Sequence, residues 1–170
     1  MNILLVRPDG IGDEILSLPV ASALRQLRPE ARITFLSSAY AAPVLAHHPA
    51  LDEIWTVDGT ESFGRLVALF RKGIDAALFL KPFRRLMMAA WCARVPQRVA
   101  TGYRWYGLFA NHRVYEHRSD FTKHESEYNL GLLQGLGIEP GPVVPPRLVV
   151  TSEEQAWAEA AVASIQSPRV

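Results

Sequence analysis

The residues with the clearest chemical potential stand in one short loop near the N-terminus, where Asp13 and Glu14 follow Gly10 and Gly12. Four consecutive apolar residues at positions 3–6 precede the loop, as is typical of a strand buried on both faces of a parallel sheet. Apolar residues at helical spacing follow it. In open α/β sheets such a corner lies at the carboxyl end of a strand, where ligands bind. The polar residues of this loop are therefore the first candidates for chemistry.

Two interpretations of Asp13 fit this position. As the N-cap of the following helix, its carboxylate would accept hydrogen bonds from free N–H groups and stabilise the helix by about 1 kcal/mol. As a carboxylate held at the mouth of the sheet and facing a cleft, it would act as a general base. Position alone favours neither interpretation.

The loop fails the tests for two glycine-rich phosphate motifs. A dinucleotide fingerprint needs a third glycine where Ile15 stands, and a P-loop needs Gly-Lys-Ser/Thr where Asp13 and Glu14 follow Gly12. A helix N-terminus attracts phosphate, but two carboxylates at that place would repel it. This argues against a small doubly wound nucleotide binder of the flavodoxin or response-regulator type.

The elements that must position this loop alternate between strand and helix along the chain. Strands are predicted at 3–6, 32–36, 53–57, 75–80, 97–102 and 147–150, and helices at 16–27, 63–72, 84–93, 123–136 and from 151 onward. Such alternation predicts right-handed βαβ crossovers and a doubly wound, mainly parallel, Rossmann-like sheet. Pro19 falls within the first helix, so we expect a bend there.

Composition excludes several classes of protein. With 18 basic and 17 acidic residues among 170, the net charge is +1, so no global field attracts nucleic acid. The single cysteine, Cys92, cannot form an internal disulfide, and the N-terminus lacks the pattern of a signal peptide. No apolar run approaches the roughly 20 residues that span a bilayer. These features predict a cytoplasmic α/β protein.

Other catalytic arrangements find little support. His47 and His48 are adjacent, which rarely aims both rings at one ion, so no metal site is predicted. No Gly-x-Ser-x-Gly elbow occurs, and Cys92 lies in an apolar helical context without a nearby base. The aromatic residues Tyr103, Trp105, Tyr106 and Phe109 suit either sugar rings or packing over the sheet edge.

Two groups of residues resemble a known family. Arg7, the pair Gly12-Asp13 and the pair Leu18-Pro19 follow the N-terminal strand as they do in glycosyltransferase family 9, the bacterial heptosyltransferases of lipopolysaccharide synthesis. His124, Asn129-Leu130 and Leu136-Gly137 match a second pattern of that family. The resemblance covers the whole chain but only the N-terminal half of the enzyme.

The resemblance implies a GT-B architecture with the reaction in the cleft between two domains. Residues 1–150 would form the Rossmann-like acceptor-binding domain, and residues 151–170 a helix leading toward a donor-binding domain absent from this chain. Asp13 would be the base that deprotonates the acceptor hydroxyl, with inversion at the sugar. The co-substrate would be an ADP-heptose-type donor held by the absent domain, with no further cofactor.

The resemblance also implies an acidic, lipid-linked acceptor, the inner core of lipopolysaccharide, and with it peripheral association with the inner face of the plasma membrane. Such an acceptor needs cations around the cleft. Besides Gly12 in the loop, the candidates stand in loops or at helix starts: Arg7, Lys81, Arg84, Arg104, Lys123 and His124.

Two functions remain open on the sequence. The first is the acceptor-binding half of a heptosyltransferase-like glycosyltransferase, inactive alone. The alternative is a stand-alone or degenerate sugar-binding module without catalytic activity.

Overall fold

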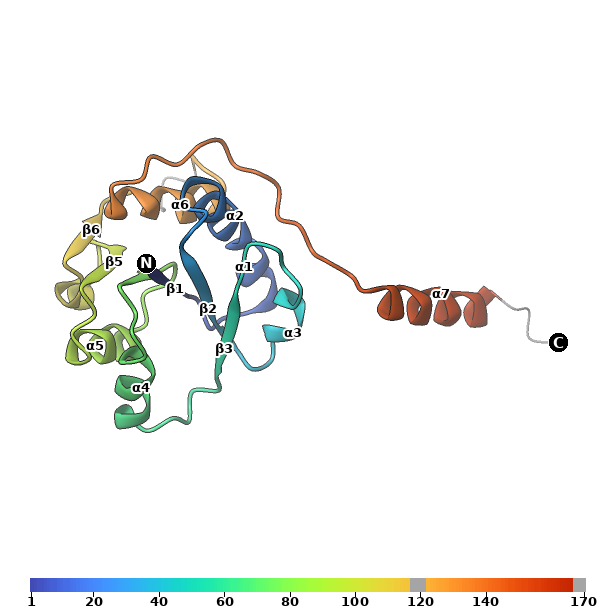
Figure 1. The fold of residues 1–170 in the computed structure, drawn as a ribbon, viewed down its shortest axis with the longest axis horizontal. Helices are drawn as coiled ribbons and strands as arrows, with labels where there is room; N and C mark the ends of the chain where they lie inside the picture. Colours follow the sequence, from blue (N-terminus) through green and yellow to red (C-terminus); the bar gives the residue numbers. More distant parts are fainter. Residues whose placement is uncertain (117–121, 167–170) are drawn as a thin grey trace.

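The computed structural model describes residues 1–116 and 122–166, and in this part of the chain six strands form one all-parallel sheet (Figure 1). The strand order is β3-β2-β1-β4-β5-β6. The strands are β1 (Asn2–Val6), β2 (Arg32–Ser38), β3 (Glu53–Val57), β4 (Ala76–Phe79), β5 (Gln97–Thr101) and β6 (His112–Val114). The predicted doubly wound, Rossmann-like fold is confirmed, and five of its strands lie where the sequence places them.

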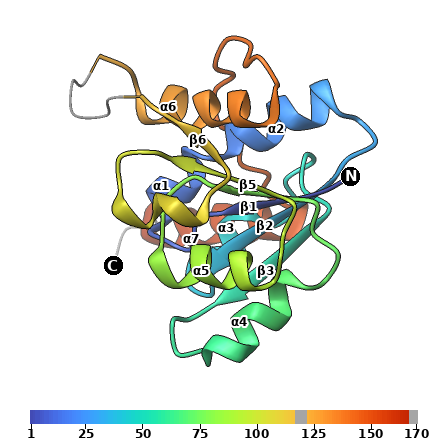
Figure 2. The ribbon, with the colours of Figure 1, turned by 90° about the vertical axis from the view of Figure 1, so that its left-hand side faces the viewer.

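Helices cover both faces of the sheet. The helices of the described chain are α1 (Ile11–Ile15), α2 (Leu18–Leu27), α3 (Ala42–Leu45), α4 (Phe63–Phe70), α5 (Arg84–Cys92), α6 (Glu125–Gly131) and α7 (Ser152–Gln166), with 3₁₀ turns η1 (Trp105–Phe109) and η3 (Leu132–Leu136). All of them except α7 belong to the body that contains the sheet. Figure 2 shows α2 and α6 above the sheet and α4 and α5 below it. The candidate site lies at the carboxyl-terminal edge of the sheet, between these two layers of helices.

The central strand β1 divides its side chains between two cores. Ile3 and Leu5 pack in the cluster under α2 and α6, and Leu4 and Val6 pack in the cluster under α4 and α5. All four side chains are fully buried. Because successive side chains of a strand point to opposite faces, a strand covered on both faces must be apolar throughout.

The expected interruption at Pro19 is confirmed as a break between two helices. The first, α1, ends at Ile15, and α2 begins at Leu18, so Pro19 stands in the first turn of α2. A proline there costs no helical hydrogen bond, because the first N–H groups of a helix have no intrahelical partner. Ser17 lies at the break, where its hydroxyl donates to the Asp13 carbonyl at 2.8 Å.

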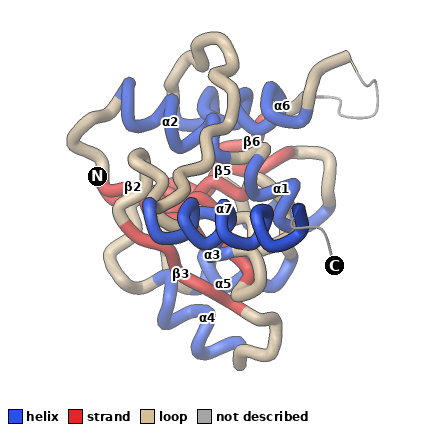
Figure 3. The backbone as a smooth tube through the Cα atoms, turned by 90° about the vertical axis from the view of Figure 1, so that its right-hand side faces the viewer, coloured by secondary structure: helices blue, strands red, loops and turns tan. Residues whose placement is uncertain are grey.

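The C-terminal part of the chain corrects one prediction. Residues 147–150 were expected to form a strand, but they belong to a long loop that leads to α7 (Figure 3). An extended apolar run becomes a strand only when a neighbouring strand accepts its hydrogen bonds, and these residues lie outside the sheet. The helix α7 forms as predicted and extends away from the sheet (Figure 1). Residues 167–170 of the predicted 151–170 segment lie outside the described residues.

Candidate active site

A polar cleft lies where the strand order reverses. Strands β1 and β4 are neighbours, and the chain leaves them toward opposite faces of the sheet, so their carboxyl ends flank the crevice where open α/β sheets bind ligands. The cleft has a volume of about 830 Å³. Its lining comes from the end of β5, from the segments after β1, β4, β5 and β6 and from α6: Arg7, Asp13, Leu16, Lys81, Pro82, Thr101, Tyr103, Arg104, Tyr106, Glu116 and Glu125.

Asp13 faces this cleft and is not the N-cap of its helix. The N-cap of α1 is Gly10, which makes no side-chain capping bond, and Asp13 stands in the first turn with 43% of its side chain exposed. The capping interpretation of Asp13 is therefore wrong. The Asp13 Oδ1 atom instead accepts a hydrogen bond from Arg7 Nη2 at 2.7 Å.

Arg7 is a buried cation at the end of β1, with an exposed fraction of only 3%. Its Nη1 donates to Glu125 Oε1 at 2.8 Å and to Asn129 Oδ1 at 3.2 Å, while Asp9 lies 4.0 Å from Nη2. A buried charge must be paired and hydrogen-bonded, because removing it from water is costly. Carboxylates from three segments meet this requirement at the two terminal nitrogens of Arg7, whereas its buried Nε has no hydrogen-bond partner among the described residues.

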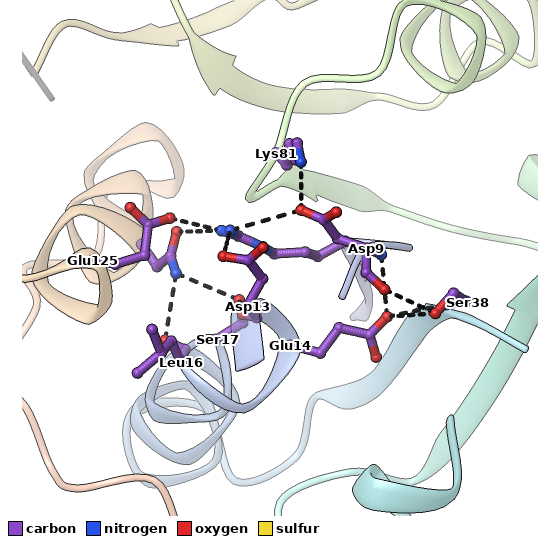
Figure 4. A network of polar contacts seen from close by, with 10 residues as sticks. Asp9, Asp13, Glu14, Leu16, Ser17, Ser38, Lys81 and Glu125 are labelled. Atoms are coloured by element: carbon purple, nitrogen blue, oxygen red, sulfur yellow. Dashed lines mark hydrogen bonds and ion pairs between the residues drawn. The ribbon is translucent and has the colours of Figure 1, made fainter. Parts of the chain in front are cut away.

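Lys81, which lines the cleft, forms a second ion pair with Asp9. Lys81 Nζ lies 2.5 Å from Asp9 Oδ2 (Figure 4). Burial raises the pKa of the Asp9 carboxyl, but the hydrogen bond and charge of Lys81, together with the Gly10 N–H, outweigh it and lower the pKa below its ordinary value of 3.8. Asp9 is thus held in its charged form.

Both carboxylates, Asp13 and Glu14, stand in the first turn of α1, as the sequence predicts, but the Glu14 side chain does not line the cleft. Its side chain is fully buried against the end of β2, where Oε2 accepts from Ser37 Oγ at 2.5 Å and Oε1 from the Ser38 N–H at 3.0 Å. Burial raises the pKa of Glu14, and these hydrogen bonds only partly oppose that effect. Of the two carboxylates, Asp13 lines the cleft and Glu14 does not.

Three of the cations proposed from the sequence line the cleft: Arg7, Lys81 and Arg104. Arg104 is exposed, and among residues 1–116 and 122–163 no carboxylate pairs with it, whereas Arg7 and Lys81 are committed to the ion pairs above. Arg104 is therefore the cleft cation most open to an anionic ligand. Beside it in the lining stand Tyr103 and Tyr106, two of the four aromatic residues noted in the sequence.

The other candidate residues lie outside the cleft lining. Arg84 is exposed at the first position of α5. Lys123 pairs with the cleft residue Glu116 at 2.8 Å. His124 is the N-cap of α6, where its Nδ1 accepts from the Ser126 N–H at 3.3 Å. Their roles in acceptor binding stay predictions.

Gly12 lies exposed in the first turn of α1, beside the cleft, and a Cβ atom built on it meets nothing within 4 Å. Packing within the described chain therefore does not require a glycine at this position. Its role in acceptor binding also stays a prediction.

Sequence reasoning missed several residues of the site. Glu116, Glu125 and Thr101 line the cleft, and Asn129 supports Arg7 from behind. Asn129 matched a family pattern without an assigned role, Thr101 stood near the carboxyl end of a predicted strand, and Glu116 and Glu125 carried no local signal. Their positions depend on chain crossovers that bring residues more than 90 positions apart into one cleft.

Comparisons with known proteins find a relative by sequence and several solved structures with the same fold. No protein-family model matches the chain. A Haemophilus influenzae protein described as a "putative glycosyltransferase" is 28% identical over 152 residues, which are 86% of this chain and 44% of that protein.

Solved structures share the fold. A family 9 glycosyl transferase from Veillonella parvula aligns with a TM-score of 0.83 at 21% identity, over 99% of this chain and 50% of that one. The fold is that of the N-terminal half of family 9 glycosyltransferases. ADP-heptose lipopolysaccharide heptosyltransferase II of E. coli aligns with a TM-score of 0.77 at 20% identity, over 96% of this chain and 51% of that one.

The resemblance of the sequence to the N-terminal half of family 9 is thereby confirmed. A third structure, E. coli heptosyltransferase WaaC with ADP-2-deoxy-2-fluoro heptose, aligns with a TM-score of 0.68 at 15% identity, over 85% of this chain and 51% of that one. The chain spans about half the length of each of these three solved proteins. Among the described residues, none of the helices has the length and apolar character needed to cross a membrane.

Proposed function

We propose that this chain is the acceptor-binding half of a glycosyltransferase that moves a heptose-type sugar from an ADP-heptose-type donor to a lipopolysaccharide core acceptor. The observation that carries the proposal is Asp13, a half-exposed carboxylate in a cleft of about 830 Å³ at the switch point of a family 9 fold. The comparisons do not favour the alternative of a sugar-binding module without activity.

In the proposed reaction, Asp13 removes the proton from the attacking acceptor hydroxyl. The hydroxyl oxygen forms a bond to the anomeric carbon of the donor sugar, and the bond from that carbon to the diphosphate oxygen breaks. The electron pair of the broken bond leaves with the nucleoside diphosphate. Attack from the face opposite the leaving group inverts the anomeric carbon. Because Arg7 engages Oδ1 of Asp13, we assign the proton to Oδ2.

The acceptor site we propose combines Arg104 with Tyr103 and Tyr106. An exposed guanidinium binds a carboxylate or phosphate through two parallel hydrogen bonds, and aromatic rings pack against the apolar face of a sugar. All three side chains line the same cleft as Asp13. This arrangement supports an acidic saccharide as the acceptor.

The donor is assigned to the part of the enzyme beyond this chain. The chain covers half of each family 9 structure, and the structures of E. coli WaaC hold ADP or ADP-2-deoxy-2-fluoro heptose. We therefore expect the purified chain to bind a de-acylated inner-core oligosaccharide but not to transfer heptose to it. Heptose transfer by the chain alone would contradict this assignment.

Asp13→Asn in the full-length enzyme tests the mechanism. The variant keeps the size of the side chain but cannot accept the proton, so we expect kcat to fall by about 10²- to 10⁴-fold. The affinity of the acceptor oligosaccharide, measured by calorimetry on the chain, should change less than about twofold, because the base acts in the transition state. Asp75→Asn, an exposed substitution before β4, provides the matched control. An unchanged kcat in Asp13→Asn would remove Asp13 from the mechanism.

A further inference from the structure

Helix α6 reaches the carboxylate of Asp13 through Arg7. The guanidinium lies between them, with Nη2 at 2.7 Å from Asp13 Oδ1 and Nη1 at 2.8 Å from Glu125 Oε1 and 3.2 Å from Asn129 Oδ1. We call these four residues the Arg7 clamp. It joins the start of α1 to a helix more than 110 positions later in the chain.

The clamp is rigid on the side of α6. Asn129 is fully buried, and its Nδ2 donates to the Leu16 carbonyl at 3.3 Å and to Ser17 Oγ at 3.4 Å (Figure 4). The Ser17 hydroxyl in turn donates to the backbone carbonyl of Asp13. Asp13 is thus held at its carboxylate by Arg7 and at its main chain by the junction that Asn129 supports.

Glu125 and Asn129 can act together because they stand four residues apart on α6. Residues at this spacing share one face of a helix, so both oxygens reach the same Nη1 atom. The capping box of His124 and Glu127 fixes where α6 begins and therefore where this face points.

The charges of the clamp explain why a second acid is present. If Asp13 were the sole partner of the guanidinium, the full positive charge of Arg7 would act on the Asp13 carboxylate. That charge would pull the carboxylate away from an acceptor hydroxyl. Glu125 shares the charge and fixes the second nitrogen, so the guanidinium cannot rotate about its long side chain. Arg7 is therefore held in place by Glu125 while it orients the Asp13 carboxylate.

We propose that Glu125 and Asn129 are positioning residues that hold the Asp13 carboxylate, through Arg7, in the orientation needed for proton transfer. This role rests on the proposed function. Arg7, predicted from the sequence to bind the acceptor, takes a positioning role as well.

Glu125→Gln in the full-length enzyme tests the clamp. Glutamine keeps an oxygen for Nη1 but removes the charge that shares the guanidinium, so we expect kcat to fall by about tenfold to hundredfold. The acceptor affinity should stay within about twofold of wild type, because Glu125 acts on the base and not on the ligand. Glu139→Gln is the matched control: it also removes one negative charge, but from an exposed side chain outside the cleft lining and the Arg7 clamp, so kcat should not change.

A double variant separates positioning from a structural effect. In an Asp13→Asn background, Glu125→Gln should reduce kcat no further, because the group it positions is already inactive. A full additional loss in that background, or a loss of acceptor affinity that matches the loss of kcat/KM, would overturn the proposal. If Glu125→Gln fails to fold, Arg7→Lys replaces it, because lysine keeps the charge but lacks the planar fork whose two nitrogens bind Asp13 and Glu125 separately. Unchanged kcat in Arg7→Lys would also overturn the proposal.

The two proposals fail differently. Unchanged kcat in Asp13→Asn contradicts the proposed base, whereas loss of kcat in Asp13→Asn with none in Glu125→Gln contradicts the clamp alone.

Discussion

Lys81 Nζ lies 2.5 Å from Asp9 Oδ2, and this ion pair joins the segment after β4 to the segment after β1. These are the two strands between which the strand order reverses. Elsewhere in such a sheet a crossover helix ties neighbouring strand ends together, but at the reversal the connections diverge. The ion pair therefore adds a side-chain link between the two loops that diverge beyond the paired ends of β1 and β4.

Replacing Lys81 should make stability depend on pH in a defined way. The pKa of Asp9 is lowered from 3.8, so its charged form contributes stability above pH 3.8 that is lost as the pH falls through the lower, folded-state value. Lys81→Met should therefore be less stable than wild type at pH 7 by up to about 1 kcal/mol, since the lysine is half exposed. Urea unfolding along a pH series should show this difference shrinking below pH 3.8. An equal difference at every pH would mean that lost packing, not the ion pair, is responsible.

Glu14→Gln should remove a second contribution to the pH dependence of the free energy of unfolding. Burial raises the pKa of Glu14 above 4.5, so the folded state holds the proton more tightly, and stability falls as the pH rises from 4.5 through the folded-state value. The slope contributed by this one group is at most about 1.4 kcal/mol per pH unit. Thermal or urea unfolding of the variant should lack this slope.

The hydrogen bonds around Glu14 explain why glutamine should fit. The Ser37 hydroxyl has one proton for two acceptors, Glu14 Oε2 at 2.5 Å and the Ser38 carbonyl at 2.9 Å. A glutamine amide can donate to Ser37 Oγ, which leaves the hydroxyl proton for the Ser38 carbonyl. A variant less stable than wild type at pH 7 would show that the ionised carboxylate is the stabilising form.

Gly12→Ala should separate folding from ligand binding. A Cβ atom at this position meets nothing within 4 Å, and alanine is favoured over glycine inside a helix by roughly 0.5–1 kcal/mol. We expect the variant to be more stable than wild type but to bind the acceptor oligosaccharide several-fold more weakly, because the methyl group occupies space beside Asp13. Gly64→Ala is the matched control, since Gly64 holds the same second position of α4 and its Cβ also meets open space. Equal acceptor affinity in both variants would exclude close approach of the acceptor to Gly12.

Arg104→Gln should weaken acceptor binding and its salt dependence together. The guanidinium has no carboxylate partner among residues 1–116 and 122–163, so its removal leaves no buried charge behind and should hardly change stability. A charge-assisted hydrogen bond contributes about 1.5–3 kcal/mol, which corresponds to an affinity loss of about 10- to 100-fold. Arg71→Gln, exposed at the end of α4, changes the net charge equally and should leave affinity unchanged. Similar losses in both variants would indicate a general charge effect in place of a contact.

The fold could be predicted from sequence because its strands carry strong local signals. Buried parallel strands such as β1 and β4 are continuous apolar runs, and the break before Pro19 follows from the chemistry of one residue. The edge strand β6 was missed because His112 and Arg113 are exposed and only Val114 is buried. A segment of three residues with one apolar side chain shows no alternation of apolar and polar residues that would predict a strand. Its strand character comes from its hydrogen-bonded pairing with β5.

The site was harder to predict because its contacts are long-range. Asp13, Lys81 and Arg104 were found from their places after predicted strands, where ligands bind in such sheets. The sequence cannot show that Arg7 is committed to Glu125 and Asn129, since that contact depends on how α6 packs. Asp13 and Glu14 are adjacent and chemically alike, and only the direction of each side chain from α1 separates a cleft residue from a buried one.

The cleft draws its lining from the end of β5, from segments that follow four different strands and from α6, while the apolar residues of the strands are enclosed in the two cores. Changes in these segments can alter which ligand the cleft accommodates without disturbing the packing that holds the protein folded. Selectivity in this architecture can therefore diverge rapidly between descendants of one ancestor while the scaffold is conserved.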